Sequence, residues 1–226
     1  DINYLINIKD YNAIGDGLCN DTSAINTAIY IAPKGSVIIV PKGVYLVDQI
    51  LSRSDIDLYL EKGAKLLQSY NRKNLAILKV YQKNYYHKDA FINSSWEGNP
   101  LDSYCSLIFG KNIENVRIYG DGIIDGNGEE GQWWLEPKVK KIAFRPRNIF
   151  LDSCNNISLV SFTSENSAAW NIHLFYCKNI YAYDLKINSN PNSPNTDGFD
   201  PESCSNVKII GCHFKVGDDC IAIKSG

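Results

Sequence analysis

A six-residue pattern recurs four times in the second half of this 226-residue sequence. Its order is an apolar residue or Cys, a polar residue, Asn, Ile or Val, a polar residue and an apolar residue. The copies are Ile113–Ile118, Cys154–Leu159, Cys177–Ala182 and Cys204–Ile209. The last three begin at residues 154, 177 and 204, which are 23 and 27 residues apart. A unit this short cannot bury its own apolar face, so successive units must stack on one another.

Each unit has room for short strands but not for a crossover helix. Stacking like on like therefore predicts an all-β fold, a parallel β-helix in which equivalent positions lie roughly 4.8 Å apart. The Cys of the pattern is then expected to form an inward ladder, and the Asn is expected to lie at a turn. An antiparallel sandwich is the alternative architecture, but the fixed pattern argues against it.

The first 35 residues lack the repeat and are predicted to form a cap. Asp21-Thr22-Ser23 offers helix N-cap side chains. Apolar residues then recur at helical spacing at Ala24, Ile25, Ala28 and Ile29. Short β-rich runs follow at Ser36–Val40, Val44–Val47 and Ile56–Leu60. We therefore expect one domain over residues 1–226, with the cap over residues 1–35 and coils over residues 36–226.

Charge and apolar patterning exclude two classes of partner. The chain has 23 Lys and Arg against 25 Asp and Glu, a net charge of −2, so it has no basic excess to neutralise nucleic-acid phosphates. Its longest apolar runs, such as Val37–Val40, are far too short to span a bilayer. We expect neither a nucleic-acid partner nor a membrane partner.

The seven cysteines do not suggest a metal site. Their number is odd, no two have Cys-x-x-Cys spacing, and the chain has three His. A structural zinc site is therefore not expected. The cysteines are interpreted as mostly buried free thiols, because free Cys is among the most buried residue types.

Two short acidic motifs lie about one coil apart near the end of the sequence. They are Asn195-Thr196-Asp197-Gly198 and Gly217-Asp218-Asp219-Cys220. Asp197 and Asp219 are 22 residues apart, so stacking should place them on adjacent coils with Asp218 alongside. Either motif alone is ordinarily a solvated turn. It is the one-coil spacing that predicts a functional site.

A further set of side chains falls on the same surface when the sequence is counted back by one coil. Trp170 and His173 then lie level with Asp197 and Asp200. Carboxylates this close cannot all ionise cheaply, so at least one pKa is expected to rise. A protonated carboxyl beside an ionised one supplies the acid and the base that hydrolysis of a glycosidic bond requires. Tyr and Trp, of which the chain has 14 and four, suit the faces of sugar rings.

Segments along nearly the whole chain follow a known family pattern. They are Asn12–Gly17, Leu60–Ala64, Gly120–Gly128, Trp133-Trp134, Asn195–Asp200 and Gly217–Gly226. In these segments the chain resembles the polygalacturonase family of glycoside hydrolases, family 28. The resemblance implies a right-handed parallel β-helix, a solenoid with a short N-terminal capping helix.

The same resemblance implies inverting hydrolysis of the α-1,4-galacturonosyl linkages of pectin or polygalacturonate, with no metal and no other cofactor. By resemblance, Asp218 is the general acid, and Asp197 and Asp219 activate the water. The expected substrate-binding residues are Asp200, His173 and Lys224. The partner implied is an acidic plant cell-wall polysaccharide, and a secreted or periplasmic location follows from that substrate.

The chain departs from the family pattern in one respect. The family carries a Gly-His-Gly and an Arg-Ile-Lys motif further along, and neither occurs within residues 1–226. We therefore expect the chain to be the N-terminal portion of such a hydrolase, cut short at its C-terminal end, and leave open whether it is active alone. The local cations Lys224, Arg145 and Arg147 are each interpreted as surface or turn residues.

Other functions remain open at this point. A calcium-dependent pectate lyase shares the β-helix and would use the three Asp as calcium ligands. A non-catalytic carbohydrate-binding β-helix would carry them as turn residues. Rhamnogalacturonan and xylogalacturonan are alternative substrates. The segment Gln82–Asp102, which contains Trp96, would favour exo cleavage if it walled off one end of a cleft, although a mobile surface loop is its ordinary interpretation.

Overall fold

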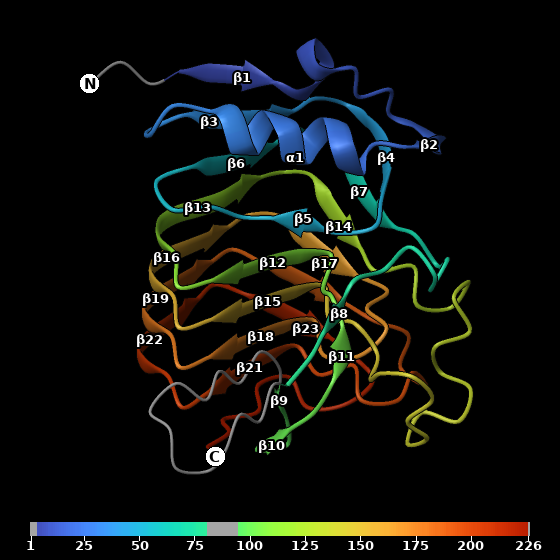
Figure 1. Cartoon of the computed structure of the whole chain (residues 1–226). Coiled ribbons are helices and arrows are strands. Elements are labelled where there is room, and N and C mark those ends of the chain that lie inside the picture. Colours follow the sequence, from blue (N-terminus) through green and yellow to red (C-terminus); the bar gives the residue numbers. More distant parts are fainter. Residues whose placement is uncertain (1–3, 81–94, 226) are drawn as a thin grey trace.

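Three parallel sheets run the length of the molecule, and successive coils each add a strand to them (Figure 1). The computed structural model describes residues 4–80 and 95–225. The first sheet contains β1 (Leu5–Asn7), β3 (Val37–Val40), β6 (Asp57–Leu60), β13 (Glu114–Gly120), β16 (Asn155–Val160), β19 (Lys178–Tyr183) and β22 (Ser205–Ile210). The second sheet contains β2 (Asp16–Asn20), β4 (Gly43–Val47), β7 (Ala64–Gln68), β14 (Ile123–Asp125), β17 (Thr163–Glu165), β20 (Lys186–Asn188) and β23 (His213–Lys215).

The third sheet has five strands and closes the coils on the remaining side. It contains β5 (Ile50–Leu51), β12 (Ile108–Lys111), β15 (Ile149–Asp152), β18 (Ile172–Phe175) and β21 (Phe199–Glu202). Two short antiparallel pairs lie outside the coils. They are β8 (Ile77–Leu78) with β11 (Ser103–Tyr104), and β9 (Ser95–Trp96) with β10 (Asn99–Pro100). The predicted parallel β-helix is confirmed, and the antiparallel sandwich is excluded.

The sequence repeat coincides with the stacking of the first sheet. The Ile or Val of each copy pairs with that of the next, in the order Val116, Ile157, Ile180 and Val207. These side chains point into one apolar core that fills the solenoid. The predicted strands at residues 36–40, 44–47 and 56–60 are β3, β4 and β6, each within one residue of its expected bounds.

The Asn of the repeat was predicted to lie at a turn, but it is the second residue of each strand of the first sheet and takes a backbone conformation that few residues tolerate. The four φ values, for Asn115, Asn156, Asn179 and Asn206, are 57°, 56°, 56° and 54°. Asn adopts this left-handed region more readily than other residues with a side chain. Their side chains also bond from coil to coil: the Asn179 amide donates to Asn155 at 2.8 Å, and that of Asn206 donates to Asn179 at 2.6 Å.

The Cys of the repeat forms the predicted inward ladder. Cys154 and Cys177 are buried and Cys204 is half-buried, and all seven cysteines are free thiols. The Sγ of Cys177 donates to the carbonyl of Leu151 at 3.3 Å, one coil earlier. The thiols of the repeat therefore pack in the core. Cys19 and Cys220 are exposed, and only three of the seven cysteines are buried, so the interpretation that the cysteines are mostly buried is wrong.

One α-helix, α1 (Thr22–Ile31), lies at the N-terminal end of the coils in the described residues, as expected (Figure 1). The helix buries Ile25 and Ala28. Its Asn26 holds it to the chain at β5, because the side-chain amide donates to the carbonyl of Gln49 at 2.9 Å and the side-chain oxygen accepts from the Leu51 N–H at 2.9 Å. The helix thus covers the first edge of the third sheet.

The expected side-chain cap on α1 is not formed. Asp21 is the N-cap residue, but its side chain makes no capping bond. Its carboxylate instead accepts from the N–H groups of Ile14 at 2.7 Å and Gly15 at 2.9 Å. The loop before the helix therefore competes successfully for this carboxylate. Within the described residues, no helix is long and apolar enough to cross a membrane.

Replacing Asn179 tests whether its backbone conformation or its side-chain ladder contributes more. We expect N179A to lower the free energy of unfolding by about 2 kcal/mol, because Ala loses two hydrogen bonds and resists a left-handed φ. N179G should lose less, since Gly adopts this φ without strain. Denaturant unfolding of the two variants measures both. Equal losses would show that the left-handed φ of Asn179 does not affect the free energy of unfolding.

Candidate active site

The third sheet carries polar and aromatic side chains on its outward face. Its inward side chains, such as Ile172 and Phe199, belong to the core. Because side chains alternate along a strand, their neighbours point outward. In β18 and β21 these are His173, Phe175, Asp200 and Glu202. The parallel register pairs His173 directly with Asp200, which confirms the predicted adjacency.

The two acidic motifs lie on neighbouring coils, as their 22-residue spacing predicts. The N–H of Gly198 donates to the carbonyl of Asp219 at 2.9 Å. A bridge between Glu202 and Lys224 continues the same register. The backbones of Asp197 and Asp219 are therefore adjacent, at the edge of the outward face.

Thr196 joins the two motifs. Its hydroxyl accepts from the Gly217 N–H at 3.2 Å and lies 2.6 Å from the hydroxyl of Ser193. A Cβ on Gly217 would stand 2.3 Å from the Ser193 carbonyl oxygen, so only glycine fits this approach. The glycine therefore lets the backbone that carries Asp218 come close to the preceding motif.

Lys224 lies between two of the predicted carboxylates. Its Nζ is 3.5 Å from Oδ2 of Asp197 and 3.7 Å from Oδ2 of Asp200. The ammonium also lies 4.6 Å from the ring centre of Trp170. Its side chain is only 18% exposed, so its interpretation as a surface residue is wrong.

The predicted rise in carboxyl pKa values occurs, and its main cause is burial. Burial raises the pKa of Asp200 to about 9, with the charge of Asp197 as the next cause. Burial also raises the pKa of Asp197; Lys224 opposes the rise, and the charge of Asp218 adds to it. Asp218 and Asp219 themselves are exposed. The carboxyls therefore differ widely in environment.

A buried pair lies directly beside Asp200. His173 and Glu202 are fully buried, and Nε2 of His173 is 2.7 Å from Oε2 of Glu202. Burial lowers the pKa of His173 to about 4, so the ring is neutral at neutral pH and donates to the carboxylate. Burial alone would raise the pKa of Glu202, but hydrogen bonds from His173 and Ser95 outweigh it and leave that pKa lowered.

The two arginines expected at the surface are buried, which corrects that interpretation. Arg145 donates to the carbonyls of Ala168 and Pro194, both at 2.8 Å, and to the Asn195 side chain at 2.7 Å. Arg145 therefore fixes the loop that leads into Asp197. Burial lowers its pKa to about 10, so it stays charged at neutral pH.

Arg147 lies deeper, against the aromatic side chains of the outward face. It is 1% exposed and donates to the hydroxyl of Ser103 at 2.9 Å and to the carbonyl of Ser95. Its guanidinium lies 5.0 Å from the ring centre of Phe150. The sequence repeat could not predict that Arg147 is buried, because its partners Ser95 and Ser103 belong to a segment outside the coils.

Part of the segment Gln82–Asp102 packs on this face. Residues 82–94 of this segment lie outside the described residues. Trp96 stacks on Trp170 with ring centres 4.6 Å apart and on Phe144 at 5.3 Å. The hydroxyl of Ser95 donates to Glu202 at 2.8 Å. The surface-loop interpretation is therefore wrong for Ser95 and Trp96, whereas Glu97, Asn99 and Pro100 are exposed.

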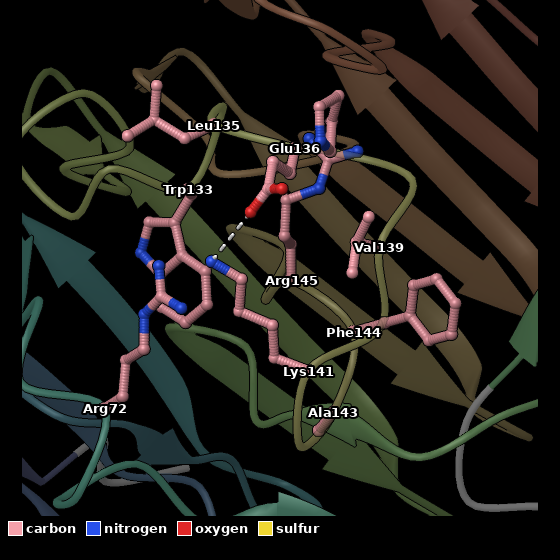
Figure 2. A pocket seen from close by; sticks show the side chains of 10 residues that line it. Arg72, Trp133, Leu135, Glu136, Val139, Lys141, Ala143, Phe144 and Arg145 are labelled. Atoms are coloured by element: carbon pink, nitrogen blue, oxygen red, sulfur yellow. Dashed lines mark ion pairs between the residues drawn. The ribbon is translucent and has the colours of Figure 1, made fainter.

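A small hollow lies beside the site and is separate from it. Figure 2 shows Trp133, Lys141 and Arg145 among its lining residues. Its volume of about 20 Å³ holds about one water molecule, which is far too little for a sugar ring. Arg72 lies over the Trp133 ring at 4.0 Å, and Lys141 pairs with Glu136 at 3.5 Å. We therefore do not place the substrate there.

Several residues of the site were not identified from the sequence. Glu202 had a usable signal, because it lies two residues after Asp200 on the same strand and must share its face. Ser95 and Trp96 had none, since they belong to no repeat. Among the described residues, no group of three or more His, Cys, Asp or Glu side chains is arranged to hold a metal ion.

Enzymes that hydrolyse glycosidic bonds use pairs of carboxyl groups whose pKa values differ. The sequence profile described as "Glycosyl hydrolases family 28" matches residues 34–226. The chain belongs to this family.

Known proteins agree with this assignment. A "Probable polygalacturonase" of Vitis vinifera is 34% identical over 97% of this chain and 44% of its own length. A hyperthermoactive exopolygalacturonase from Thermotoga maritima superposes with a TM-score of 0.84 at 25% identity, over the whole chain and 55% of that structure. A family 28 exopolygalacturonase from Yersinia enterocolitica superposes with a TM-score of 0.82 at 24% identity, over 98% of this chain and 45% of that structure. The chain thus spans less than half the length of the Vitis relative, and the fold is the right-handed β-helix of these structures.

Replacing Thr196 by Val tests the link between the two motifs. We expect T196V to lower the free energy of unfolding by about 1–3 kcal/mol, because the Gly217 N–H loses its acceptor. The Gly217 amide should also exchange its hydrogen faster. T163V, at a partly exposed position of β17, is the matched control and should change stability by less than about 0.5 kcal/mol. Equal effects of the two substitutions would contradict the proposed link.

Proposed function

We propose that the protein hydrolyses α-1,4-galacturonosyl linkages of pectin or polygalacturonate. The observation that carries this proposal is the coupling of two acidic motifs on adjacent coils of a family 28 β-helix, through Thr196 and Gly217. The names of the Vitis and Thermotoga relatives support the substrate. Rhamnogalacturonan and xylogalacturonan stay as alternative substrates within the same chemistry.

The proposed reaction is a single inverting displacement. Asp218 gives its proton to the leaving glycosidic oxygen while that bond breaks. Asp197 and Asp219 accept a proton from water, whose oxygen forms the new bond to the anomeric carbon. Such a reaction needs the acid and base about 6.5–9.5 Å apart, which neighbouring coils and side-chain reach allow.

The remaining predicted residues would act around this group. Lys224 lies 3.5 Å from Asp197 and is the cation that we propose to contact a galacturonate carboxylate. Asp200 and His173 were predicted to bind the sugar, but both are fully buried, so we propose that they support the site from beneath without touching the sugar. An acidic polysaccharide of the plant cell wall is the proposed partner, and a secreted or periplasmic location suits it.

Replacing Asp218 by Asn tests the acid. We expect the release of reducing ends from polygalacturonate by the full-length protein, in excess chelator, to fall by roughly 10²–10⁴-fold, because Asn cannot donate the proton. D121N changes an exposed carboxylate in another turn and should leave the rate unaltered.

The outcome separates three functions. Loss of activity in D218N alone supports the hydrolase. Activity that requires calcium and yields unsaturated products would instead support a lyase. Binding of polygalacturonate without turnover in the unaltered protein would support a carbohydrate-binding module.

We further propose that the enzyme attacks chain ends. The observation behind this is the Trp96–Trp170 stack, which covers the indole next to Lys224 and Asp197. A polysaccharide that cannot pass beyond Trp96 must present an end to the carboxylates. The similar protein from Thermotoga is an exopolygalacturonase, which is consistent with this.

Replacing Trp96 by Ala tests this arrangement. We expect W96A to lower the viscosity of polygalacturonate more per bond cleaved, because removing the ring opens the covered end to internal attack. W134A is the matched control, since Trp134 packs in a different cluster with Trp133. An unchanged ratio of viscosity loss to reducing ends in W96A would contradict chain-end attack.

A further inference from the structure

Asp200 has almost nothing to stabilise a negative charge. Its side chain is fully buried, and in the described part of the chain neither carboxyl oxygen accepts a hydrogen bond. Its one ion-pair contact there is Lys224, at 3.7 Å. A buried carboxylate without donors is strongly disfavoured relative to its neutral form.

Lys224 cannot balance both of its neighbours. Its ammonium carries one positive charge and lies nearer to Asp197, at 3.5 Å, than to Asp200, at 3.7 Å. The charge of Arg145 also acts on Asp197, but its hydrogen bonds go to two carbonyls and to the Asn195 side chain, so neither carboxylate gains a donor from it. With both carboxylates ionised, Asp200 would hold a buried negative charge with no hydrogen-bond donor and only the longer contact to Lys224. Such an arrangement is resolved in proteins when one group takes up a proton.

The other charged groups around Asp200 balance one another. His173, on the paired strand, is neutral, and Glu202, on the same strand, is an ionised acceptor of His173 and Ser95. Arg147 supplies a positive charge that acts on both Glu202 and Asp200. Since Glu202 uses that charge, Lys224 remains for a single carboxylate. On the far side, Asp218 adds negative charge near Asp197.

We propose that Asp200 carries a proton at neutral pH and acts as a positioning residue. Asp197 then carries the negative charge and forms the ion pair with Lys224. This inference deepens the proposed function, because Asp197 must be ionised to accept a proton from water. Burial raises the pKa of Asp200 to about 9, which agrees with the geometry. As a neutral acid, Asp200 can also donate its own hydrogen bond toward Asp197.

Stability measurements test this without substrate. If Asp200 is neutral when folded and ionised when unfolded, unfolding releases a proton wherever the pH lies between the unfolded value of 3.8 and the folded value of about 9. Raising the pH then favours unfolding of the unaltered protein. D200N has no such proton. The unfolding equilibrium constant of the unaltered protein, divided by that of D200N, should rise by up to about tenfold per pH unit between about pH 5 and pH 8.

The control is D121N, the same substitution at an exposed carboxylate, for which the ratio should not depend on pH over this range. A flat ratio for D200N would overturn the proposal, because it would mean that Asp200 is ionised and paired with Lys224. If D200N does not fold, ¹³C NMR of labelled aspartate in the unaltered protein decides instead. One buried carboxyl resonance should remain at its protonated position at neutral pH, and its absence would overturn the proposal.

These readouts are independent of the proposed function. A pH-dependent ratio with no hydrolysis of polygalacturonate would retain the protonated Asp200 and reject the activity. Hydrolysis of polygalacturonate with a ratio that does not change with pH would retain the activity and reject the protonated Asp200.

Discussion

In-register stacking of parallel coils is the constraint on which this molecule depends. Backbone hydrogen bonds hold each strand against its counterpart one coil away, so equivalent side chains become neighbours. For apolar positions this builds the core directly, as in the line from Val116 to Val207. For neutral polar positions it builds ladders, because an amide such as Asn179 both donates and accepts. Register alone therefore explains why so simple a repeat specifies a fold.

Charged positions are harder to stack, since like charges are brought together as readily as like apolar groups. On the second sheet, Asp125 and Glu165 pair in register, and Lys65 lies 2.9 and 3.0 Å from them. Lys65 and Glu165 are partly exposed, so water also stabilises their charges. Beside the third sheet, Asp197 and Asp200 share Lys224, and these two carboxyl side chains are 6% and 0% exposed. Where neighbouring carboxyls are buried, their pKa values separate, and one group can hold a proton while the other stays ionised.

The sequence predicted the capping helix and the early strands from local patterning, and the neighbours across coils from the repeat. Spacing was sufficient to place His173 beside Asp200 and Asp197 next to the coil of Asp219, because register is a matter of counting. It could not reveal that Arg145 is buried, since that depends on a loop around Asn195. Nor could it place Trp96 on Trp170, because these rings meet through a segment that follows no period. Residues fixed by backbone pairing were predictable; residues fixed by irregular loops were not.

The turns of this solenoid differ in length without disturbing the sheets. Residues 126–148 separate β14 from β15, far more than most connections here, yet Ile108 still pairs with Ile149 and Asp125 with Glu165. Chain added at a turn does not shift the coils on either side. Such a protein can therefore lengthen or exchange its loops while the residues of its coils keep their mutual positions.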